Sequence, residues 1–423
     1  MPPASSLPTP PPAPAAPASS SAPRERLLSL DVFRGLTIAG MLLVNTPGTW
    51  GAIYPPLEHA AWNGWTPTDL IFPFFLFIVG ITTELSLSAR RARGDDERAV
   101  VRQIVRRGAL IFLFGFLLNG VPFFTWTAIP GNPDPMFLQR VVDRLYGWRL
   151  LGVLQRIGLA YIAAGLISRR ASVKQLVAVI AAILLGYWIA LTCLPVPGTH
   201  GTIGALLLDR PEATMAAWWD RTLLDWTRFG LGNHIWPVSV TWDPEGFFST
   251  IPAVATCLFG NLAGRWIVQR ERPLLDRVSG LFAVGALGMM AGLMWNWALP
   301  INKNLWTSSY VLFTAGVAAV ALATIVWIVD VQGVKWWVRP WVVYGRNPLI
   351  AYVGSFFMAR MMYSVLSVSY QGRTVSLQEA VFRAWFLPWA SPVNASLAFA
   401  VVFVLLWYGI LVVLDRRHII LKV

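Results

Sequence analysis

Long apolar segments alternate with shorter polar ones along most of the chain. Ten of the apolar segments are long enough to cross about 30 Å of hydrocarbon as helices. They lie near residues 31–46, 68–88, 105–121, 151–168, 174–194, 248–266, 277–297, 309–329, 347–366 and 394–414. The segments lack the short alternation of polar and apolar residues that barrel strands require. The pattern predicts an all-α polytopic membrane protein with about ten transmembrane helices in one bundle.

The composition excludes a water-soluble protein. Of the 423 residues, 56% are hydrophobic and only 13% are charged, whereas soluble domains contain about 25% charged residues. The two cysteines, Cys193 and Cys257, lie in or beside apolar segments and do not indicate a disulfide framework. No ligand spacing predicts a metal site. A cytosolic enzyme, a disordered scaffold and a secreted disulfide-rich domain are therefore excluded.

The chain divides into a short tail and a membrane domain. Residues 1–25 consist mainly of Pro, Ala and Ser, which predicts a disordered segment, and residues 26–423 form the membrane domain. Lys and Arg outnumber Asp and Glu by 34 to 21. Because these cations lie between the apolar segments, they indicate topology rather than nucleic-acid binding. With the N-terminus placed inside, 23 of them fall in inner stretches and 9 in outer ones, which predicts that both termini are cytoplasmic.

The densest run of polar residues surrounds the first two apolar segments. Asp31 and Arg34 are three residues apart at a helix start, a spacing typical of a structural pair. His59 lies in the following outer loop, and Asp69 near the next helix start is placed to hydrogen-bond one of its ring nitrogens. An imidazole with a pKa of about 6.5 can take a proton at neutral pH. On spacing alone, however, a satisfied loop histidine is the commoner interpretation.

Four long outer loops contain further polar candidates. The loops at 47–67, 122–150, 195–247 and 367–393 are rich in Trp, Pro, Gly and Asn, and long ordered loops often carry function. Asp243 and Glu245 precede one apolar segment, where they either cap a helix or bind an amine. Arg156 and Arg360 lie inside apolar segments, and we expect each to pair with an acid such as Glu84 or to face a tunnel.

Six motifs resemble those of the heparan-α-glucosaminide N-acetyltransferase family, whose bacterial members include the inner-membrane proteins called NagX. The motifs are SLDVFRGLTIAGMLLVN at 29–45, HAAWNGWTPTDLIFPFFLFIVG at 59–80, GVLQRIGLAY at 152–161, DPEGFFSTIP at 243–252, LPINKNLWTSSYVLFTAG at 299–316 and GRNPLIAYV at 345–353. The set is specific, although each motif alone is weak. The resemblance implies a multi-pass acetyltransferase, in a bacterial inner membrane, that takes acetyl-CoA from the cytosol and acetylates a glucosamine-type amino sugar on the outer face.

The resemblance also implies catalytic residues. The histidine of the family's H-x-x-W-N-G motif falls on His59, which then serves as general base or acetyl-accepting group. The asparagine that closes the first conserved helix falls on Asn45, which is placed to donate to the oxyanion. Asp69 completes the expected catalytic set.

Substrate contacts follow from the same motifs. The expected acceptor-binding residues are Trp62, Asn63, Asp243 and Glu245. Because CoA is cytosolic and His59 is placed outside, the pantetheine arm must pass through the bundle. The CoA phosphates then need cations or helix N-termini at the inner mouth, and the candidates are Arg34, Arg346, Asn347 and the basic cluster at 90–107. No metal or permanently bound cofactor is expected, and a homodimer is left open.

Two other functions remain open. An amino-sugar uptake transporter for N-acetylglucosamine fits a helix bundle with an outer vestibule, but the chain has no convincing internal repeat. An O-acyltransferase of envelope glycans requires the same groups with a hydroxyl acceptor.

Overall fold

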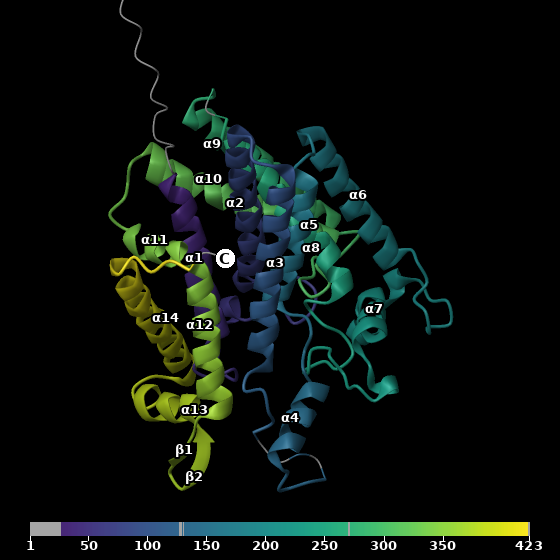
Figure 1. Ribbon diagram of the computed structural model, residues 1–423, viewed down its shortest axis with the longest axis vertical. Helices are drawn as coiled ribbons and strands as arrows, with labels where there is room; N and C mark the ends of the chain where they lie inside the picture. The colour runs from purple at the N-terminus through teal and green to yellow at the C-terminus, as the bar shows by residue number, and fades with distance from the viewer. Residues whose placement is uncertain (1–26, 127–128, 130, 270, 422–423) are drawn as a thin grey trace, which may run out of the picture.

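The computed structural model describes residues 27–126, 129, 131–269 and 271–421, so the predicted disordered tail, residues 1–25, lies outside the described residues. The described chain is a bundle of long helices (Figure 1). These helices are α1 (Leu28–Asn45), α2 (Ile71–Arg93), α3 (Glu97–Gly120), α5 (Val153–Ser168), α6 (Val173–Thr192), α8 (Phe247–Ile267), α9 (Leu274–Trp295), α10 (Ser308–Val326), α12 (Pro348–Arg360) and α14 (Pro392–Arg416). Each predicted apolar segment coincides with one of them.

Seven described helices are long and apolar enough to cross a membrane. They are α1, α2, α6, α8, α9, α10 and α14, with α2 and α10 lengthened by the turns beside them. The described chain is mostly helical, as predicted, and its seven apolar helices indicate a multi-pass membrane protein. The count of ten spans and the cytoplasmic placement of both termini stay predictions. The spans assigned to α3, α5 and α12 stay predictions, because α5 and α12 are shorter, with 16 and 13 residues, and the first half of α3 is basic.

Local sequence signals begin and end the helices. At α3, the Asp96 side chain accepts a hydrogen bond from the Ala99 amide, and at α6 Ser172 and Gln175 form a reciprocal capping box. Gly94 ends α2 in the left-handed conformation, with φ of 69°. Such caps satisfy the backbone groups that a helix end leaves unpaired.

Glycines let the central helices α2 and α8 approach closely. A Cβ added at Gly80 would lie 2.0 Å from the Cys257 carbonyl oxygen, and one added at Gly260 would lie 2.0 Å from that of Phe77. Helices in lipid gain association energy from close packing of small residues. These two glycines therefore fix the spacing of α2 and α8.

A buried carboxylate joins three helices near their basic ends. Glu84 on α2 is fully buried and contacts Arg91 at 2.8 Å, Arg265 of α8 at 3.2 Å and the Ser168 hydroxyl of α5 at 2.6 Å. The two cations and the hydroxyl compensate the cost of burying its charge. Glu84 therefore does not pair with Arg156.

Shorter elements fold in the connections between the long helices. They are α4 (Phe137–Tyr146), α7 (Met215–Leu224), α11 (Arg339–Arg346), α13 (Leu377–Val381) and the strands β1 (Ser367–Tyr370) and β2 (Arg373–Ser376). The two strands form an antiparallel hairpin in which Ser367 pairs with Ser376 and Tyr370 with Arg373. Figure 1 places α4, α13 and this hairpin together at the lower end of the molecule.

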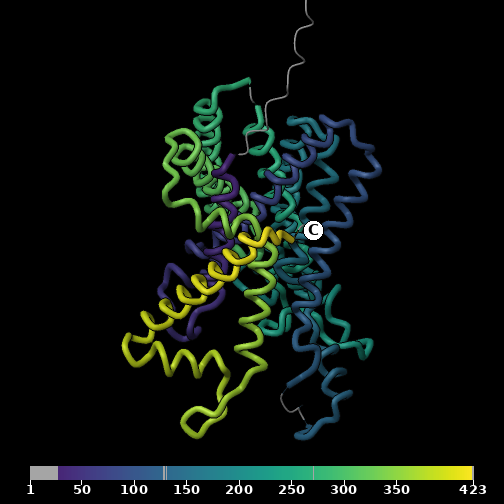
Figure 2. Tube along the Cα trace, turned by 60° about the vertical axis from the view of Figure 1, so that its left-hand side comes forward, coloured from purple at the N-terminus to yellow at the C-terminus, as the bar shows by residue number. Residues whose placement is uncertain are grey.

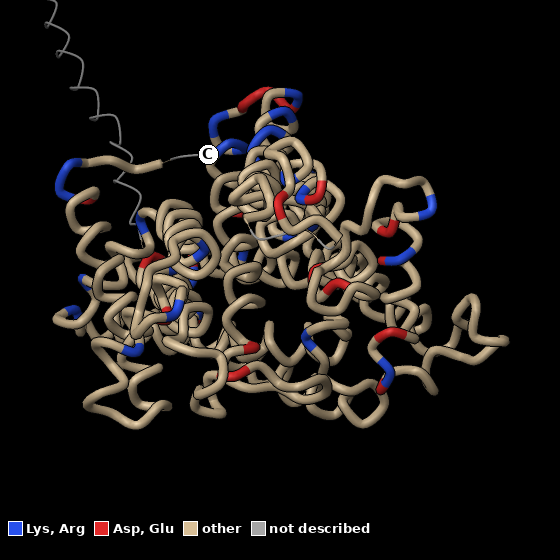
Figure 3. The backbone as a smooth tube through the Cα atoms, turned by 90° about the horizontal axis from the view of Figure 1, so that it is seen from below, with Lys and Arg blue, Asp and Glu red and all other residues tan. Residues whose placement is uncertain are grey.

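The two ends of the bundle differ in charge. Three basic segments span tight connections between helices, namely 90–107 between α2 and α3, 169–174 between α5 and α6, and 265–277 between α8 and α9. These connections lie at the upper end of the molecule in Figure 1, which is called here the basic end. Seen from below, most of the backbone carries neither Lys or Arg nor Asp or Glu (Figure 3). Helix α14 lies obliquely across the bundle, and the tail that follows it ends at mid-height beside α3 (Figure 2). The end opposite the basic end carries the long loops and His59.

Candidate functional site

His59 and Asp69 form a hydrogen-bonded pair just before α2. The His59 Nδ1 atom lies 2.6 Å from Asp69 Oδ1. The His59 side chain is 42% exposed, whereas that of Asp69 is 1% exposed. This contact confirms that Asp69 is placed to bond a ring nitrogen. With Nδ1 bound to the carboxylate, the neutral ring carries its lone pair on Nε2.

The carboxylate of Asp69 is held in place by the loop that it closes. Its Oδ2 atom accepts hydrogen bonds from the Ala60 and Thr66 amides, both at 3.0 Å. These bonds belong to a capping box that opens the 3₁₀ turn Pro67–Leu70 before α2. The Tyr310 hydroxyl on α10 donates to the Asp69 carbonyl oxygen at 2.5 Å. Asp69 is therefore both a helix cap and the partner of His59.

Lys303, in the loop between α9 and α10, completes this cluster. Its Nζ atom lies 3.1 Å from His59 Nδ1 and 3.2 Å from Nε2. It lies 3.7 Å from Asp69 Oδ1, beyond hydrogen-bond length. Burial lowers the pKa of Lys303, and the carboxylates of Asp69 and Glu245 offset this only in part. Sequence reasoning missed this residue, although it is the one cation of the quoted motif LPINKNLWTSSYVLFTAG.

Trp62 and Asn63 anchor the histidine loop to the segment before α7. The Trp62 indole donates to the Leu208 carbonyl oxygen at 2.7 Å, and the Asn63 amide donates to the Asp209 carboxylate at 2.6 Å. Asn302 also donates to Asn63 Oδ1 at 3.1 Å. Both side chains have structural partners, and their predicted contact with an acceptor stays a prediction.

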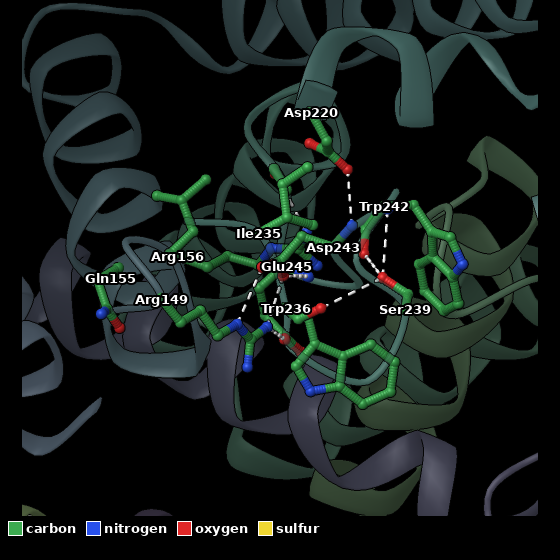
Figure 4. A network of polar contacts seen from close by, with 12 residues as sticks. Arg149, Gln155, Arg156, Asp220, Ile235, Trp236, Ser239, Trp242, Asp243 and Glu245 are labelled. Atoms are coloured by element: carbon green, nitrogen blue, oxygen red, sulfur yellow. Dashed lines mark hydrogen bonds and ion pairs between the residues drawn. The ribbon is translucent and has the colours of Figure 1, made fainter. Parts of the chain in front are cut away.

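Asp243 and Glu245 converge on Arg149 (Figure 4). The Arg149 guanidinium contacts Asp243 Oδ2 at 2.9 Å through Nε, and Asp243 Oδ1 and Glu245 Oε2 at 2.5 Å each through Nη2. Burial alone raises the pKa of Glu245, but Arg149 and the neighbouring cations lower it below the usual value. The Glu245 carboxylate is thus held charged beside the start of α8. Arg149 went unrecognised in the sequence because it lies 94 residues from Asp243.

Two further buried groups adjoin this network. Arg156 is fully buried and donates to the Ser249 hydroxyl at 2.5 Å and to Thr250 at 3.3 Å. We expected an acidic partner for Arg156, but the side chains that it hydrogen-bonds are these two hydroxyls. On α7, Asp220 accepts a hydrogen bond from the Asp243 amide at 2.8 Å. Burial raises the pKa of Asp220 to about 7, despite the hydrogen bonds that it accepts.

A large cavity of about 650 Å³ lies within the bundle and is lined by residues of α1, α2, α3, α5 and α12 and of the tail after α14. Arg34, Arg107 and Arg346 line it, so two residues predicted at the inner mouth and one from the predicted cluster share one cavity. Along α1 the lining runs from Arg34 to Met41, which is about 10 Å at 1.5 Å per residue. Arg34 also contacts Asp31 at 3.4 Å, as predicted.

A smaller cavity of about 130 Å³ continues toward the opposite end. Met41 and Tyr352 line both cavities, which therefore share a wall. Asn45 lines the smaller one, and so does Arg360, whose Nε donates to the Val121 carbonyl oxygen at 3.3 Å. Among the described lining residues of these two cavities, His59 is absent.

The tail after α14 closes one side of the large cavity. His418, Ile420 and Leu421 line it. The Asn347 side chain holds this tail, because it donates to the Ile419 carbonyl oxygen at 3.0 Å and accepts from the Leu421 amide at 3.3 Å. Asn347 therefore contacts the chain itself, and its predicted contact with CoA stays a prediction. In the described part of the chain, no three His, Cys, Asp or Glu residues are grouped to hold a metal ion.

Comparison with known proteins identifies the family. The family model for the catalytic part of heparan-α-glucosaminide N-acetyltransferase matches residues 26–290. The chain belongs to this family. It is 29% identical over 371 residues to heparan-α-glucosaminide N-acetyltransferase of Homo sapiens, which covers 78% of this chain and 52% of the human protein. The Mus musculus protein of the same name is 29% identical over 375 residues, covering 78% of this chain and 53% of that protein. The chain thus spans about half the length of these curated relatives.

The stretch matched to the heparan-α-glucosaminide N-acetyltransferase family contains the histidine loop but not every residue of the cluster. His59, Asp69 and Asn45 lie inside the matched residues. Lys303 and Arg346 lie beyond the matched residues. The folded chain brings Lys303 to His59 and Arg346 to the large cavity.

Proposed function

We propose that this chain transfers an acetyl group from cytosolic acetyl-CoA to the amino group of a glucosamine-type sugar at the opposite end of the bundle. The basic end then faces the cytosol, in accordance with the positive-inside rule. The proposed location is the inner membrane of a bacterium. Membership in an N-acetyltransferase family supports the reaction class.

The observation that carries the proposal is the pair of adjoining cavities. A cavity of about 650 Å³ lies within the range of about 300–1,000 Å³ that small-molecule sites occupy. Arg34, Arg107 and Arg346 offer the CoA phosphates charge-assisted hydrogen bonds near the basic end. The two cavities adjoin at Met41 and Tyr352. We place the pantetheine arm at this junction, with its thioester toward the end opposite the basic end.

The carboxylate of Glu245 supports a route from this junction to His59. It lies close enough to act electrostatically on both Tyr352 and Lys303, and Lys303 contacts His59. Asp243 and Glu245 favour an acceptor that carries an amino group and hydroxyls. We place the amino sugar between these carboxylates and the imidazole.

The chemistry then follows from the arrangement of His59. The amine nitrogen attacks the acetyl carbon, and His59 Nε2 takes the proton that the amine loses. The new N–C bond remains when the C–S bond breaks, and the CoA thiolate leaves with the proton from His59. Such a base contributes about 10²–10⁴-fold. In the second route, Nε2 attacks the acetyl carbon first and the C–S bond breaks, so CoA leaves as the thiolate. The sugar amine then attacks the acetyl carbon, the bond from this carbon to Nε2 breaks, and the proton that the amine loses passes through Nε2 to the thiolate.

The test compares the wild-type protein with two histidine variants. Purified protein receives acetyl-CoA and glucosamine, and mass spectrometry follows N-acetylglucosamine while a thiol reagent follows CoA. We expect His59→Ala to lose at least about 10²-fold in rate with an unchanged melting temperature. The control is His200→Asn, because His200 is exposed in another loop and its φ of 54° suits Asn.

Full activity of His59→Ala contradicts the site. An acetyl ester in place of an amide indicates the O-acyltransferase. Sugar flux into proteoliposomes without acetyl-CoA, together with no acetylated product, indicates the transporter.

A further inference from the structure

Lys303 reaches His59 from a loop 244 residues away in the sequence. Its side chain is 17% exposed, and its Nζ atom is within 3.2 Å of both ring nitrogens. Because a neutral imidazole offers one lone pair, at most one of the three N–H donors of the ammonium is used there. The ammonium also forms a long ion pair with Asp69 Oδ1 at 3.7 Å, and it retains a donor for a further partner.

The carboxylate of Asp69 does not account for this position. Its Oδ1 atom is bound to His59 at 2.6 Å, and its Oδ2 atom accepts from two backbone amides. A lysine whose role is structural usually lies at hydrogen-bond distance from its counter-ion, whereas here the separation is 3.7 Å. The cation thus forms a long ion pair with Asp69 and lies closer to the reacting ring than to its counter-ion.

The loop that carries Lys303 is built with an unfavourable backbone conformation. Trp306 is fully buried and has a φ of 51°, which is uncommon for a bulky residue. Its amide donates to the Lys303 carbonyl oxygen at 3.1 Å, and the Asn302 side chain accepts from the Leu305 amide at 2.9 Å. Strained turns that their surroundings hold in one conformation are concentrated at functional sites.

The environment of Trp306 keeps that conformation fixed. Its indole donates to Thr256 at 3.2 Å, and the guanidinium of Arg156 lies 4.9 Å from its ring centroid. The ring also packs edge-on against Phe72, with centroids 5.0 Å apart. The position of Lys303 is therefore determined from three helices, α2, α5 and α8.

We propose that Lys303 is a further catalytic residue, which donates to the oxygen that becomes negative when the acetyl carbonyl is attacked beside His59. This inference rests on the proposed acetyl transfer. In the tetrahedral intermediate, the attacked carbon carries both the attacking nitrogen and the oxyanion. A base that reaches the nitrogen is therefore close to the oxyanion, and Lys303 lies within hydrogen-bond distance of that base. No step needs a further reactant, because the proton passes from the amine to His59 and then to the leaving thiolate.

The experiment compares Lys303→Met with Lys303→Arg. Acetyl transfer to glucosamine is measured together with KM for acetyl-CoA and the melting temperature. We expect Lys303→Met to lower kcat by about 10²–10³-fold and to leave KM for acetyl-CoA within about twofold, with an unchanged melting temperature. Lys303→Arg keeps the charge and is expected to retain part of the rate.

An unchanged kcat in Lys303→Met overturns the inference. An equal loss of kcat in Lys303→Met and Lys303→Arg also overturns it, because a residue that only fills space has that effect. If the wild type transfers no acetyl group, the proposed function itself fails, whereas an active wild type with an unchanged kcat in Lys303→Met overturns this inference alone.

Discussion

The His59 imidazole and the Asp69 carboxylate meet across the loop that leads into α2, with Nδ1 2.6 Å from Oδ1. The carboxylate is buried and capped by two amides, while the ring remains partly exposed. A fixed carboxylate that orients a solvent-facing imidazole is the arrangement by which other enzymes set the tautomer of a catalytic histidine. The account of this protein rests on that contact.

Replacement of Asp69 by Asn tests the orientation of the ring. The amide of Asn donates to Nδ1, so the ring proton moves to Nε2 and the base is lost. We expect Asp69→Asn to reduce the initial rate of acetyl transfer by at least about 10²-fold. Asp225→Asn is the matched control, since Asp225 lies on an outer loop and accepts from Thr227. Equal rates for the two variants contradict the role of Asp69.

The cations of the large cavity are expected to control affinity for acetyl-CoA. Arg107→Gln and Arg346→Gln each remove a cation from the lining, so we expect KM for acetyl-CoA to rise about tenfold, equivalent to about 1.4 kcal/mol, while kcat changes little. Arg373→Gln in the β1–β2 hairpin is the control. An unchanged KM in both cavity variants indicates that the nucleotide binds elsewhere.

Because α2 and α8 are in close contact at two glycines, we expect that replacing either glycine by alanine lowers the stability of the protein. Gly80→Ala and Gly260→Ala each force a Cβ onto a backbone oxygen at 2.0 Å, so we expect a loss of about 1–3 kcal/mol in stability and a lower melting temperature in detergent. Gly186 of α6 has no heavy atom within 4 Å of an added Cβ. Gly186→Ala is therefore expected to be neutral or stabilising by up to about 1 kcal/mol. Similar melting temperatures for all three variants contradict this packing.

Asp220 predicts a pH dependence of stability. Burial raises its pKa from 3.8 to about 7 in the folded protein, so the folded state favours the protonated carboxyl. Its contribution to stability is complete below pH 4 and is lost as the pH rises through about 7. We expect the melting temperature of Asp220→Asn, relative to the wild type, to rise between pH 5 and pH 8. A constant difference over that range shows that Asp220 is ionised throughout.

The sequence alone predicts those features that depend on residues close together along the chain. Apolar length alone locates the long helices, and His59 and Asp69 are only ten residues apart, so their contact is readable from the loop. Lys303 reaches His59 across 244 residues and Arg149 reaches Asp243 across 94, and no local pattern encodes either contact. The short helices α4 and α7 are missed because they lie in loops without a long apolar run. Asn347 was predicted to contact CoA, but its side chain binds the tail at Ile419 and Leu421. This contact also joins residues that are distant in the sequence.

The most direct test of the central claim is a sided assay in proteoliposomes. Protein with its basic end outward receives ¹³C-acetyl-CoA outside, while glucosamine is trapped inside, and neither compound crosses a protein-free bilayer. Mass spectrometry of the lumen then follows the product. The account predicts ¹³C-N-acetylglucosamine inside the vesicles and CoA outside, with no product from His59→Ala. Product that forms only when both substrates are on the same side contradicts it.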